Sequence, residues 1–234
     1  MKVSIVMPTY NEKENILNLI GTVLKLVKEE CEVIVVDDNS PDGTWKIVEE
    51  ISDPRVKLIR RMDEKGLASA IKKGIEASRG DVVVVMDTDF SHPPETIPDL
   101  IAATDSYHIA RGSRYVNGGG MIASKKRIFL SKVTNLFAKL LLGFGIKDYT
   151  SSFFAAKREV FEDIEILDEW GGHGNYAIGF LHTARNKGLK IKEVPFIYKD
   201  RTAGVTKTSP DKYKLLNWGV RYCFTVLRLK FKNL

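Results

Sequence analysis

Short apolar runs alternate with helical spacings of apolar residues along the first half of the chain. The runs, rich in β-branched residues, predict four strands, at residues 3–7, 32–36, 56–60 and 81–86. Between them, apolar residues recur every three or four positions and predict helices at residues 14–28, 44–51 and 67–78. This order of strands and helices predicts an α/β fold with a doubly wound, mostly parallel sheet.

The pattern loosens in the second half. A basic stretch at residues 125–142 and a segment at residues 176–187 have helical spacing. Residues 194–196 are expected at the edge of the sheet, because they include a proline, which has no N–H to donate. The sequence contains no repeat and no linker. We therefore expect one domain over residues 1–211, followed by a basic amphipathic helix over residues 212–234.

Charge and motif content narrow the range of partners. The formal net charge of +6 favours an anionic partner, such as nucleic acid, a phosphorylated substrate or a membrane surface. The sequence has no helix-turn-helix signature, zinc-finger spacing or aromatic RNA-binding strand, so we expect no nucleic-acid partner. The Gly-rich motifs of dinucleotide-binding and P-loop folds are absent as well, which disfavours NAD, FAD and NTPase chemistry.

Cysteine usage and the N-terminal segment indicate a compartment. Cys31 and Cys223 are far apart in the sequence and are expected to be buried free thiols in a reducing compartment. The chain enters a predicted strand almost at once, with no leader-like segment. No apolar run approaches the roughly 18 residues of a spanning helix. We expect a cytoplasmic protein.

Asp87 and Asp89 follow directly on the apolar run at residues 82–86. Such a run is typical of a strand buried on both faces, and ligands of open α/β sheets bind at the carboxyl ends of these strands. Two carboxylates one residue apart can hold a hard divalent cation that also bridges substrate phosphates. The alternative is an aspartate that only caps the following helix. Two further polar clusters, at residues 8–12 and 37–44, follow other predicted strands and are expected at the same edge.

These clusters belong to a longer series of motifs. The series comprises PTYNE (8–12), DDNSPDGT (37–44), KGLASA (65–70), DTDFSHPPE (87–95), GSRYVNGG (112–119), DYTSSF (148–153), and EVPF with the DR, Gly and Lys that follow it (193–207). Through these motifs the chain resembles the family 2 glycosyltransferases of the GT-A fold, and most closely the dolichol-phosphate mannose synthases. The motifs occur in the family's order and run from Pro8 to Lys207, nearly the whole chain.

The resemblance implies a role for each residue that matches a family motif. The nucleotide-sugar site would comprise Pro8, Tyr10, Glu12, Asp38, Asp87, Thr88, Asp89, Arg201 and Lys207. The cofactor would be Mg²⁺ or Mn²⁺, held by Asp87, Asp89 and Ser91. The phosphate of a polyprenyl acceptor would face Arg114, Arg127 and Ser131. The catalytic residues would be Asp89, Arg114 and Arg201.

Plainer interpretations stay open for several of these residues. Asp38 could cap its own turn, because Asx side chains bond to nearby backbone. Arg114 and Arg127 could be solvated surface charges. His92 precedes two prolines and is expected to pack or bond within its turn.

The reaction that the resemblance implies is metal-dependent transfer of a sugar, with inversion, from a nucleotide sugar to polyprenyl or dolichyl phosphate. Mannose and GDP-mannose are the first choices. A polyprenyl monophosphate is mostly dianionic at neutral pH, because its second pKa is about 6, so this acceptor needs no general base. The chain departs from the family at Thr88, Phe154 and Gly179, where a small residue, an arginine and a glutamate are usual. The departures keep two alternatives open: a transferase acting on a hydroxyl of a glycan or glycolipid, and a catalytically silent regulatory protein that binds nucleotide sugars.

The C-terminal segment suggests a place of action. Residues 212–234 contain six Lys or Arg and no Asp or Glu. One narrow polar stripe is expected to comprise Asn217, Arg221, Thr225, Arg228 and Lys232. A helix this apolar either packs on the domain or lies in the interface of an anionic membrane. With a lipid acceptor, we expect peripheral association with the cytoplasmic face of a membrane, directly or through a membrane subunit.

Overall fold

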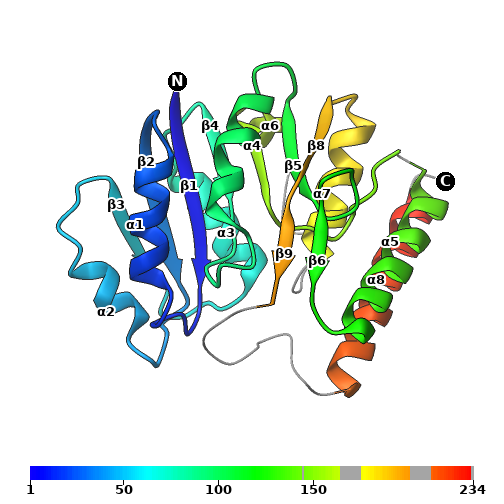
Figure 1. The fold of residues 1–234 in the computed structure, drawn as a ribbon, viewed down its shortest axis with the longest axis horizontal. Helices are drawn as coiled ribbons and strands as arrows, with labels where there is room; N and C mark the ends of the chain where they lie inside the picture. The colour runs from blue at the N-terminus through cyan, green and yellow to red at the C-terminus, as the bar shows by residue number, and fades with distance from the viewer. Residues whose placement is uncertain (144, 164–174, 201–211, 233–234) are drawn as a thin grey trace.

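A seven-stranded sheet lies at the centre of the molecule, with helices on both of its faces (Figure 1). The computed structural model describes residues 1–143, 145–163, 175–200 and 212–232. Across the sheet the strands are β3 (Val56–Arg60), β2 (Glu30–Asp37), β1 (Lys2–Thr9), β4 (Val82–Val85), β7 (Phe154–Lys157), β5 (Ile109–Ser113) and β8 (Ile191–Pro195). Neighbouring strands are parallel except at β7, which is antiparallel to both β4 and β5. The predicted α/β fold with a mostly parallel, doubly wound sheet is confirmed.

Successive residues of the central strands face two different helix layers, as the two-residue period of a strand requires. One layer packs on Ile5, Val33 and Val84 and contains α1 (Ile16–Leu26), α2 (Thr44–Glu49), the short 3₁₀ helix η1 (Pro94–Thr96) and α4 (Ile97–Ala103). The other layer packs on Val6 and Val83 and contains α3 (Leu67–Ala77), α6 (Glu159–Asp163) and α7 (Asn175–Asn186). Burial on both faces explains why the central strands read as continuous apolar runs.

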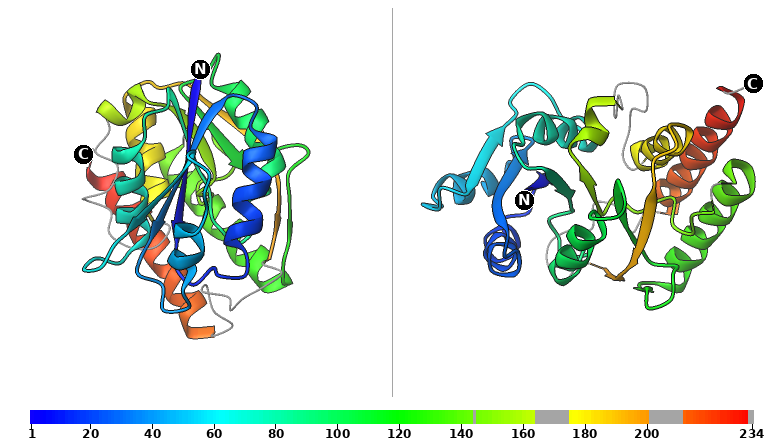
Figure 2. Two further views of the ribbon diagram at one scale, coloured as in Figure 1. Left: turned by 90° about the vertical axis from the view of Figure 1, so that its left-hand side faces the viewer. Right: turned by 90° about the horizontal axis from the view of Figure 1, so that it is seen from above.

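Two long helices, α5 (Lys125–Leu142) and α8 (Lys212–Lys232), lie side by side beyond α7 (Figures 1 and 2). They occupy the end of the molecule away from β3. A third core cluster joins them to α7 and includes Ala138, Ile178, Leu181, Val226 and Leu229. A separate ribbon consists of two parallel strands, β6 (Gly120–Ile122), which leads into α5, and β9 (Ile197–Lys199). None of the helices in the described part of the chain is long and apolar enough to cross a membrane.

Most predicted elements lie within a few residues of their observed positions. The strand at residues 56–60 and the helix at residues 125–142 coincide with β3 and α5, and β8, which ends at Pro195, lies at the edge of the sheet. The sequence pattern missed β5, because the charged Arg111 interrupts its apolar run. The short strands β6 and β9 gave no periodic signal. Cys31 and Cys223 are free, as expected, but only Cys31 is buried, and Cys223 is half-buried.

One expectation for the C-terminal helix is wrong. Thr225 does not lie on an exposed polar stripe with Arg221 and Arg228, since it is buried. Its hydroxyl donates to the carbonyl oxygen of Arg221 at 2.9 Å, one helical turn earlier. This internal bond satisfies the hydroxyl and allows threonine to face the core side of the helix.

The contact between α3 and β1 is tight enough to test. A Cβ on Gly74 would lie 2.3 Å from Cγ1 of Val6, well inside van der Waals contact. Gly74→Ala is therefore expected to lower the free energy of unfolding by about 1–3 kcal/mol through overpacking. Gly21 in α1 is the control, because a Cβ there would meet nothing within 4 Å. Gly21→Ala should raise the free energy of unfolding by up to about 1 kcal/mol through helix propensity. Urea unfolding of both variants measures the contrast, and a stabilised Gly74→Ala protein would contradict it.

Candidate functional site

The carboxyl ends of β1, β2 and β4 meet at one edge of the sheet, where the strand order reverses between β1 and β4. A reversal of this kind opens a crevice outside the strand ends. Each of the three turns that follow these strands contains a non-glycine residue in the left-handed region: Asn11 (φ 53°), Asn39 (φ 52°) and Phe90 (φ 60°). Such conformations cost energy and cluster at functional sites. The structure thus brings the three predicted polar clusters together.

The turn after β1 is fixed to the turn after β2 by hydrogen bonds. The N–H of Asn11 donates to Oγ of Ser40 at 3.0 Å, and that hydroxyl donates to Oδ2 of Asp37 at 2.6 Å. Glu12 is buried, and its N–H donates to Oγ1 of Thr44 at 3.0 Å. These bonds leave little freedom to the predicted nucleotide-binding residues of this turn. Pro8, the first residue of the PTYNE motif, lies at the end of β1, and the Nζ of Lys65 lies 5.3 Å from the ring centroid of Tyr10.

Asp38 holds a loop rather than its own turn. Its Oδ1 accepts hydrogen bonds from Nε (2.7 Å) and Nη2 of the buried Arg61, and its Oδ2 accepts the N–H of Gly66 at 2.7 Å. The turn-capping alternative applies to its neighbour Asp37, whose Oδ1 accepts the N–H of Ser40 at 2.7 Å. Asp38 therefore attaches the KGLASA segment to the edge of the sheet.

Asp87 is held by a buried histidine. The N–H of Asp87 donates to Nδ1 of His92 at 2.9 Å, and Nε2 of His92 lies 3.6 Å from Oδ2 of Asp87. The imidazole stacks on Phe153, with 4.8 Å between ring centroids and 7° between planes. Burial lowers the pKa of His92, so the ring is neutral near pH 7. The expectation that His92 packs and bonds within its turn is confirmed.

Asp89 and Ser91 form a compact turn beside Asp87. Oδ1 of Asp89 accepts the N–H of Ser91 at 3.1 Å and its hydroxyl at 2.5 Å. Oδ2 of Asp87 accepts a long hydrogen bond, 3.4 Å, from Oγ of Ser152. Burial raises the pKa of Asp87, and the negative charge of Asp89 raises it further. A cation between the two carboxylates would oppose this effect. Thr88 is buried, and its hydroxyl donates to the carbonyl oxygen of Pro8 at 3.4 Å.

The donor set at this turn consists of oxygen atoms only, which suits Mg²⁺ or Mn²⁺. Within the described ranges, no three His, Cys, Asp or Glu residues are grouped so that they could hold a metal ion by themselves. Asp87 and Asp89 would therefore supply two carboxylates and leave the remaining positions to water and substrate phosphates. This is the usual arrangement for magnesium in phosphate-binding sites.

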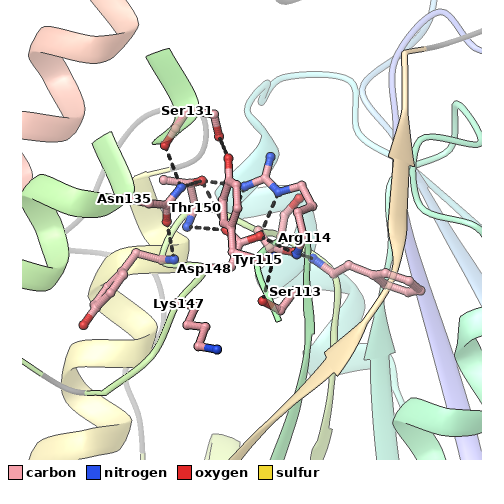
Figure 3. Close-up of polar contacts among 12 residues, drawn as sticks. Ser113, Arg114, Tyr115, Ser131, Asn135, Lys147, Asp148 and Thr150 are labelled. Carbon is pink, nitrogen blue, oxygen red and sulfur yellow. Dashed lines mark hydrogen bonds and ion pairs between the residues drawn. The ribbon is translucent and has the colours of Figure 1, made fainter. Parts of the chain in front are cut away.

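A second polar cluster is centred on a buried ion pair (Figure 3). Nε and Nη2 of Arg114 donate to the two carboxylate oxygens of Asp148, both at 2.7 Å, and Nη2 also donates to Oγ1 of Thr150 at 2.7 Å. Burial alone would raise the pKa of Asp148, but the charge and hydrogen bonds of Arg114 outweigh it and hold the pKa below its usual value. The interpretation of Arg114 as a solvated surface charge is therefore wrong.

Arg127 and Ser131 of α5 lie beside this pair. Oγ of Ser131 accepts a hydrogen bond from the hydroxyl of Tyr115 at 2.7 Å. Nη1 of Arg127 pairs with Oδ1 of Asp200 at 2.5 Å. The ring of Tyr198 is shared, because its centroid lies 5.1 Å from Cζ of Arg127 and 5.9 Å from Cζ of Arg114. The structure thus brings the three residues predicted for an acceptor phosphate into one cluster.

Arg111 is a residue that the sequence pattern missed. It is fully buried on β5, and it donates from Nε to the carbonyl of Asp148 (2.9 Å) and from Nη2 to the carbonyl of Tyr149 (3.0 Å). Arg111 is paired in register with Phe154 of β7, the position where an arginine was expected. Burial lowers its pKa to about 10, so it remains charged at neutral pH. A charged residue inside the apolar run 109–112 was the available signal.

Phe154 and Gly179, two of the positions at which the chain departs from the family pattern, are both buried. The ring of Phe154 packs against Phe161 and Phe180, at centroid distances of 6.5 and 5.0 Å. Gly179 is buried in α7. Arg201 and Lys207, predicted for the donor diphosphate, lie outside the described residues.

Comparison with known proteins agrees with the family resemblance that the sequence motifs indicate. The pattern of Glycosyl transferase family 2 matches residues 4–165. A dolichol-phosphate mannosyltransferase of Pyrococcus furiosus is 39% identical over 237 residues, which cover 93% of this chain and 64% of the relative. A polyprenol monophosphomannose synthase of Mycolicibacterium smegmatis is 36% identical over 230 residues, which cover 93% of this chain and 86% of the relative. This chain thus spans slightly less than two thirds of the first relative's length.

Solved structures share the fold. Glucosyl-3-phosphoglycerate synthase from Mycobacterium tuberculosis, in complex with Mn²⁺, UDP-glucose and phosphoglyceric acid, superposes with a TM-score of 0.73 at 21% identity. The superposition covers 98% of this chain and 79% of that chain. A complex of the same enzyme with Mn²⁺, UDP and glucosyl-3-phosphoglycerate gives a TM-score of 0.70 at 22% identity. At this identity the likeness shows a common architecture.

The buried ion pair of Arg114 and Asp148 is expected to contribute to the stability of the fold. Asp148→Asn leaves the buried guanidinium without a counter-charge and should lower the free energy of unfolding at pH 7 by about 3–5 kcal/mol. The folded-state pKa of Asp148 is lowered, so its contribution is present above the unfolded value of about 3.9 and is lost as pH falls through the folded value. As the pH is lowered below about 4, the free energy of unfolding should therefore fall less for Asp148→Asn than for the wild type.

Urea unfolding at a series of pH values measures both effects. Asp63→Asn is the control, because Asp63 is exposed. A control that loses as much stability as Asp148→Asn, or an Asp148→Asn protein as stable as the wild type, would contradict a net stabilising charge at position 148.

Proposed function

The chain belongs to glycosyl transferase family 2, and from this premise we propose that it transfers a sugar, mannose first, from a nucleotide sugar to polyprenyl or dolichyl phosphate. The observation that carries the proposal is the convergence of three polar turns on the crevice between β1 and β4, with Asp87 and Asp89 at its edge. The activities named for the two relatives, from Pyrococcus furiosus and Mycolicibacterium smegmatis, support the choice of acceptor and of mannose. GDP-mannose is the proposed donor.

The donor site is assigned to residues on these turns. Its nucleotide-sugar contacts are Pro8, Tyr10, Glu12, Asp38, Asp87, Thr88 and Asp89, with Arg201 and Lys207 added from the family motif. Asp87, Asp89 and Ser91 would hold Mg²⁺ or Mn²⁺. When bound, the ion would offset negative charge on the leaving diphosphate. His92 accepts the N–H of Asp87 and Ser91 donates to the carboxylate of Asp89. The turn that carries both carboxylates is therefore held in place, and little reorganisation is needed at the moment of reaction.

The acceptor phosphate is assigned to the cluster of Arg114, Arg127 and Ser131. Since Asp148 already engages Nε and Nη2 of Arg114, this guanidinium serves mainly as an oriented positive charge. Arg127 is a quarter exposed on α5 and is the more accessible of the two cations. Guanidinium groups form strong, charge-assisted bonds to phosphate oxygens.

The chemistry requires positioning more than proton transfer. A phosphate oxygen of the acceptor attacks the anomeric carbon from the side opposite the nucleoside diphosphate, the new C–O bond forms, and the nucleoside diphosphate leaves with inversion. Because the acceptor is mostly dianionic at neutral pH, no general base is required. This fits a chain with Gly179 where its family usually has a glutamate, whereas a sugar-hydroxyl acceptor would need a carboxylate base.

An isoprenoid acceptor resides in a bilayer, so the enzyme must work at a membrane surface. We propose that residues 1–211 form the catalytic domain, and that the protein associates peripherally with the cytoplasmic face, directly or through a membrane subunit. The basic composition of residues 212–234 supports this assignment.

Turnover on a lipid acceptor tests the proposal. Purified protein, radiolabelled GDP-mannose and Mn²⁺ are incubated with a short-chain polyprenyl phosphate, and the product is extracted into organic solvent. We expect a lipid-linked sugar that does not form when EDTA is present. Product only on a glycan or glycolipid hydroxyl would favour the hydroxyl-directed transferase. Donor binding without turnover on any acceptor would favour the silent nucleotide-sugar binder.

Asp89 offers a prediction for donor binding. Asp89→Ala should abolish the Mn²⁺-dependent part of the thermal shift caused by GDP-mannose, because one of two metal carboxylates is lost. The free energy of unfolding without ligands should change by no more than about 1 kcal/mol, since the bonds that Ser91 donates to Asp89 lie within one short turn. Asp99→Ala on the exposed side of α4 is the control and should bind like the wild type. An Asp89→Ala protein with undiminished metal-dependent binding would rule out the proposed metal site.

A further inference from the structure

Helix α5 exposes one apolar stripe. Four large apolar side chains, at spacings of three and four residues, are exposed: Phe129 (68%), Val133 (45%), Leu136 (57%) and Leu140 (74%). At 100° per residue they lie within an arc of roughly 60°. The opposite side of the helix is occupied by Thr134 and Ala138, which are buried. The helix is therefore already packed on one side while a second apolar face meets solvent.

Helix α8 repeats this arrangement. Its exposed apolar side chains are Val220 (60%), Phe224 (69%), Leu227 (39%) and Phe231 (65%), again within roughly 60° of arc. Val226 and Leu229 face the core cluster shared with α5 and α7. Helices α5 and α8 lie side by side at one end of the molecule (Figure 2). Both stripes therefore belong to that end of the molecule. Soluble proteins seldom expose this much large apolar surface on neighbouring helices without a partner.

Cations flank both stripes. On α5, Lys125, Lys132 and Lys139 are exposed at seven-residue spacing along one border, and Lys126 lies on the other. On α8, Arg221 and Arg228 border one side of the stripe, and Lys230 lies beyond the other. Neither helix contains an aspartate or a glutamate. An apolar strip between rows of cations is complementary to an anionic phospholipid surface, where apolar side chains enter the acyl boundary and cations meet headgroups.

We propose that α5 and α8 together form the surface on which this protein docks to an anionic bilayer. The choice of lipid as the occupant rests on the proposed function, and the proposal deepens it by assigning half of the docking surface to α5, within the catalytic domain. A second copy of the chain is disfavoured by charge, because two such surfaces would place cations against cations with no acidic residue between them.

The geometry links this surface to the acceptor cluster. Arg127 and Ser131 lie on the inner side of α5, facing Asp200 and Tyr115. The apolar stripe lies on the outer side of the same helix. A docked α5 would therefore present one face to the bilayer and the other to the phosphate, and an isoprenoid tail could stay in the membrane while its phosphate reaches the cluster.

Vesicle co-sedimentation tests the surface with the full chain. The vesicles contain phosphatidylcholine and phosphatidylglycerol, and the variants are Leu136→Glu on α5 and Phe224→Glu on α8. The control is Leu17→Glu on α1, where Leu17 is 57% exposed, as Leu136 is. We expect the wild type and the control to sediment, each variant to lose about tenfold or more in partitioning, and high salt to weaken binding of all proteins.

Each alternative outcome has a clear meaning. Undiminished sedimentation of Leu136→Glu would overturn the role of α5 and leave the C-terminal helix alone as the contact. A wild type that ignores the vesicles but forms a dimer disrupted by Leu136→Glu would overturn lipid as the occupant. The thermal shift with GDP-mannose and Mn²⁺ is measured in parallel for every protein. Normal donor binding together with absent sedimentation would refute the docking surface and leave the transferase proposal intact.

Discussion

The buried pair of Arg114 and Asp148 is the interaction on which the second half of the molecule depends. Asp148 receives the guanidinium of Arg114 on its carboxylate, while Arg111 binds its carbonyl and Glu193 of β8 accepts its N–H at 3.0 Å. These contacts fix the segment that leads into β7, the only antiparallel strand of the sheet in the described structure. Since each charge is costly to bury alone, the group is stable only as a unit.

The donor edge relies on a different principle. There, each acidic residue is held by polar contacts from its own turn or from a neighbouring segment: His92 accepts the N–H of Asp87, Ser91 donates to the carboxylate of Asp89, and Arg61 and Gly66 donate to the carboxylate of Asp38. Backbone in the left-handed region brings these groups to the crevice, at an energetic cost that the surrounding hydrogen bonds offset. The site is thus arranged before a ligand arrives, which is how oriented charges contribute most to catalysis.

The sequence predicted the fold where burial produces a repeating pattern. Runs such as Val82–Val85 are apolar because helices cover both faces of the strand, so β1 to β4 and most helices could be predicted. The position of the donor residues followed from the topology of a parallel sheet and from the motifs. What remained hidden depends on contacts between distant residues. The partners of Arg114 are 34 and 36 residues away, and the role of Asp38 requires Arg61 of another strand end. The exposed stripe of α5 was hidden for another reason, because helical spacing alone does not distinguish a buried apolar face from an open one.

The pairing of Arg111 with Phe154 has a consequence for how this sequence can diverge. A guanidinium at position 111 on β5 or at the facing position 154 on β7 could donate hydrogen bonds to the segment between Asp148 and Phe153. In this chain the arginine is on β5, and a phenylalanine occupies the facing position on β7. Losing Arg111 first would remove its bonds to the carbonyls, and gaining a second arginine first would bury two like charges side by side. Each single substitution is therefore disfavoured, whereas exchange of both residues would keep one cation for these carbonyls, which is a case of sign epistasis. Related sequences should accordingly carry the arginine at one of these two positions and an uncharged residue at the other, so that the residues at the two positions co-vary.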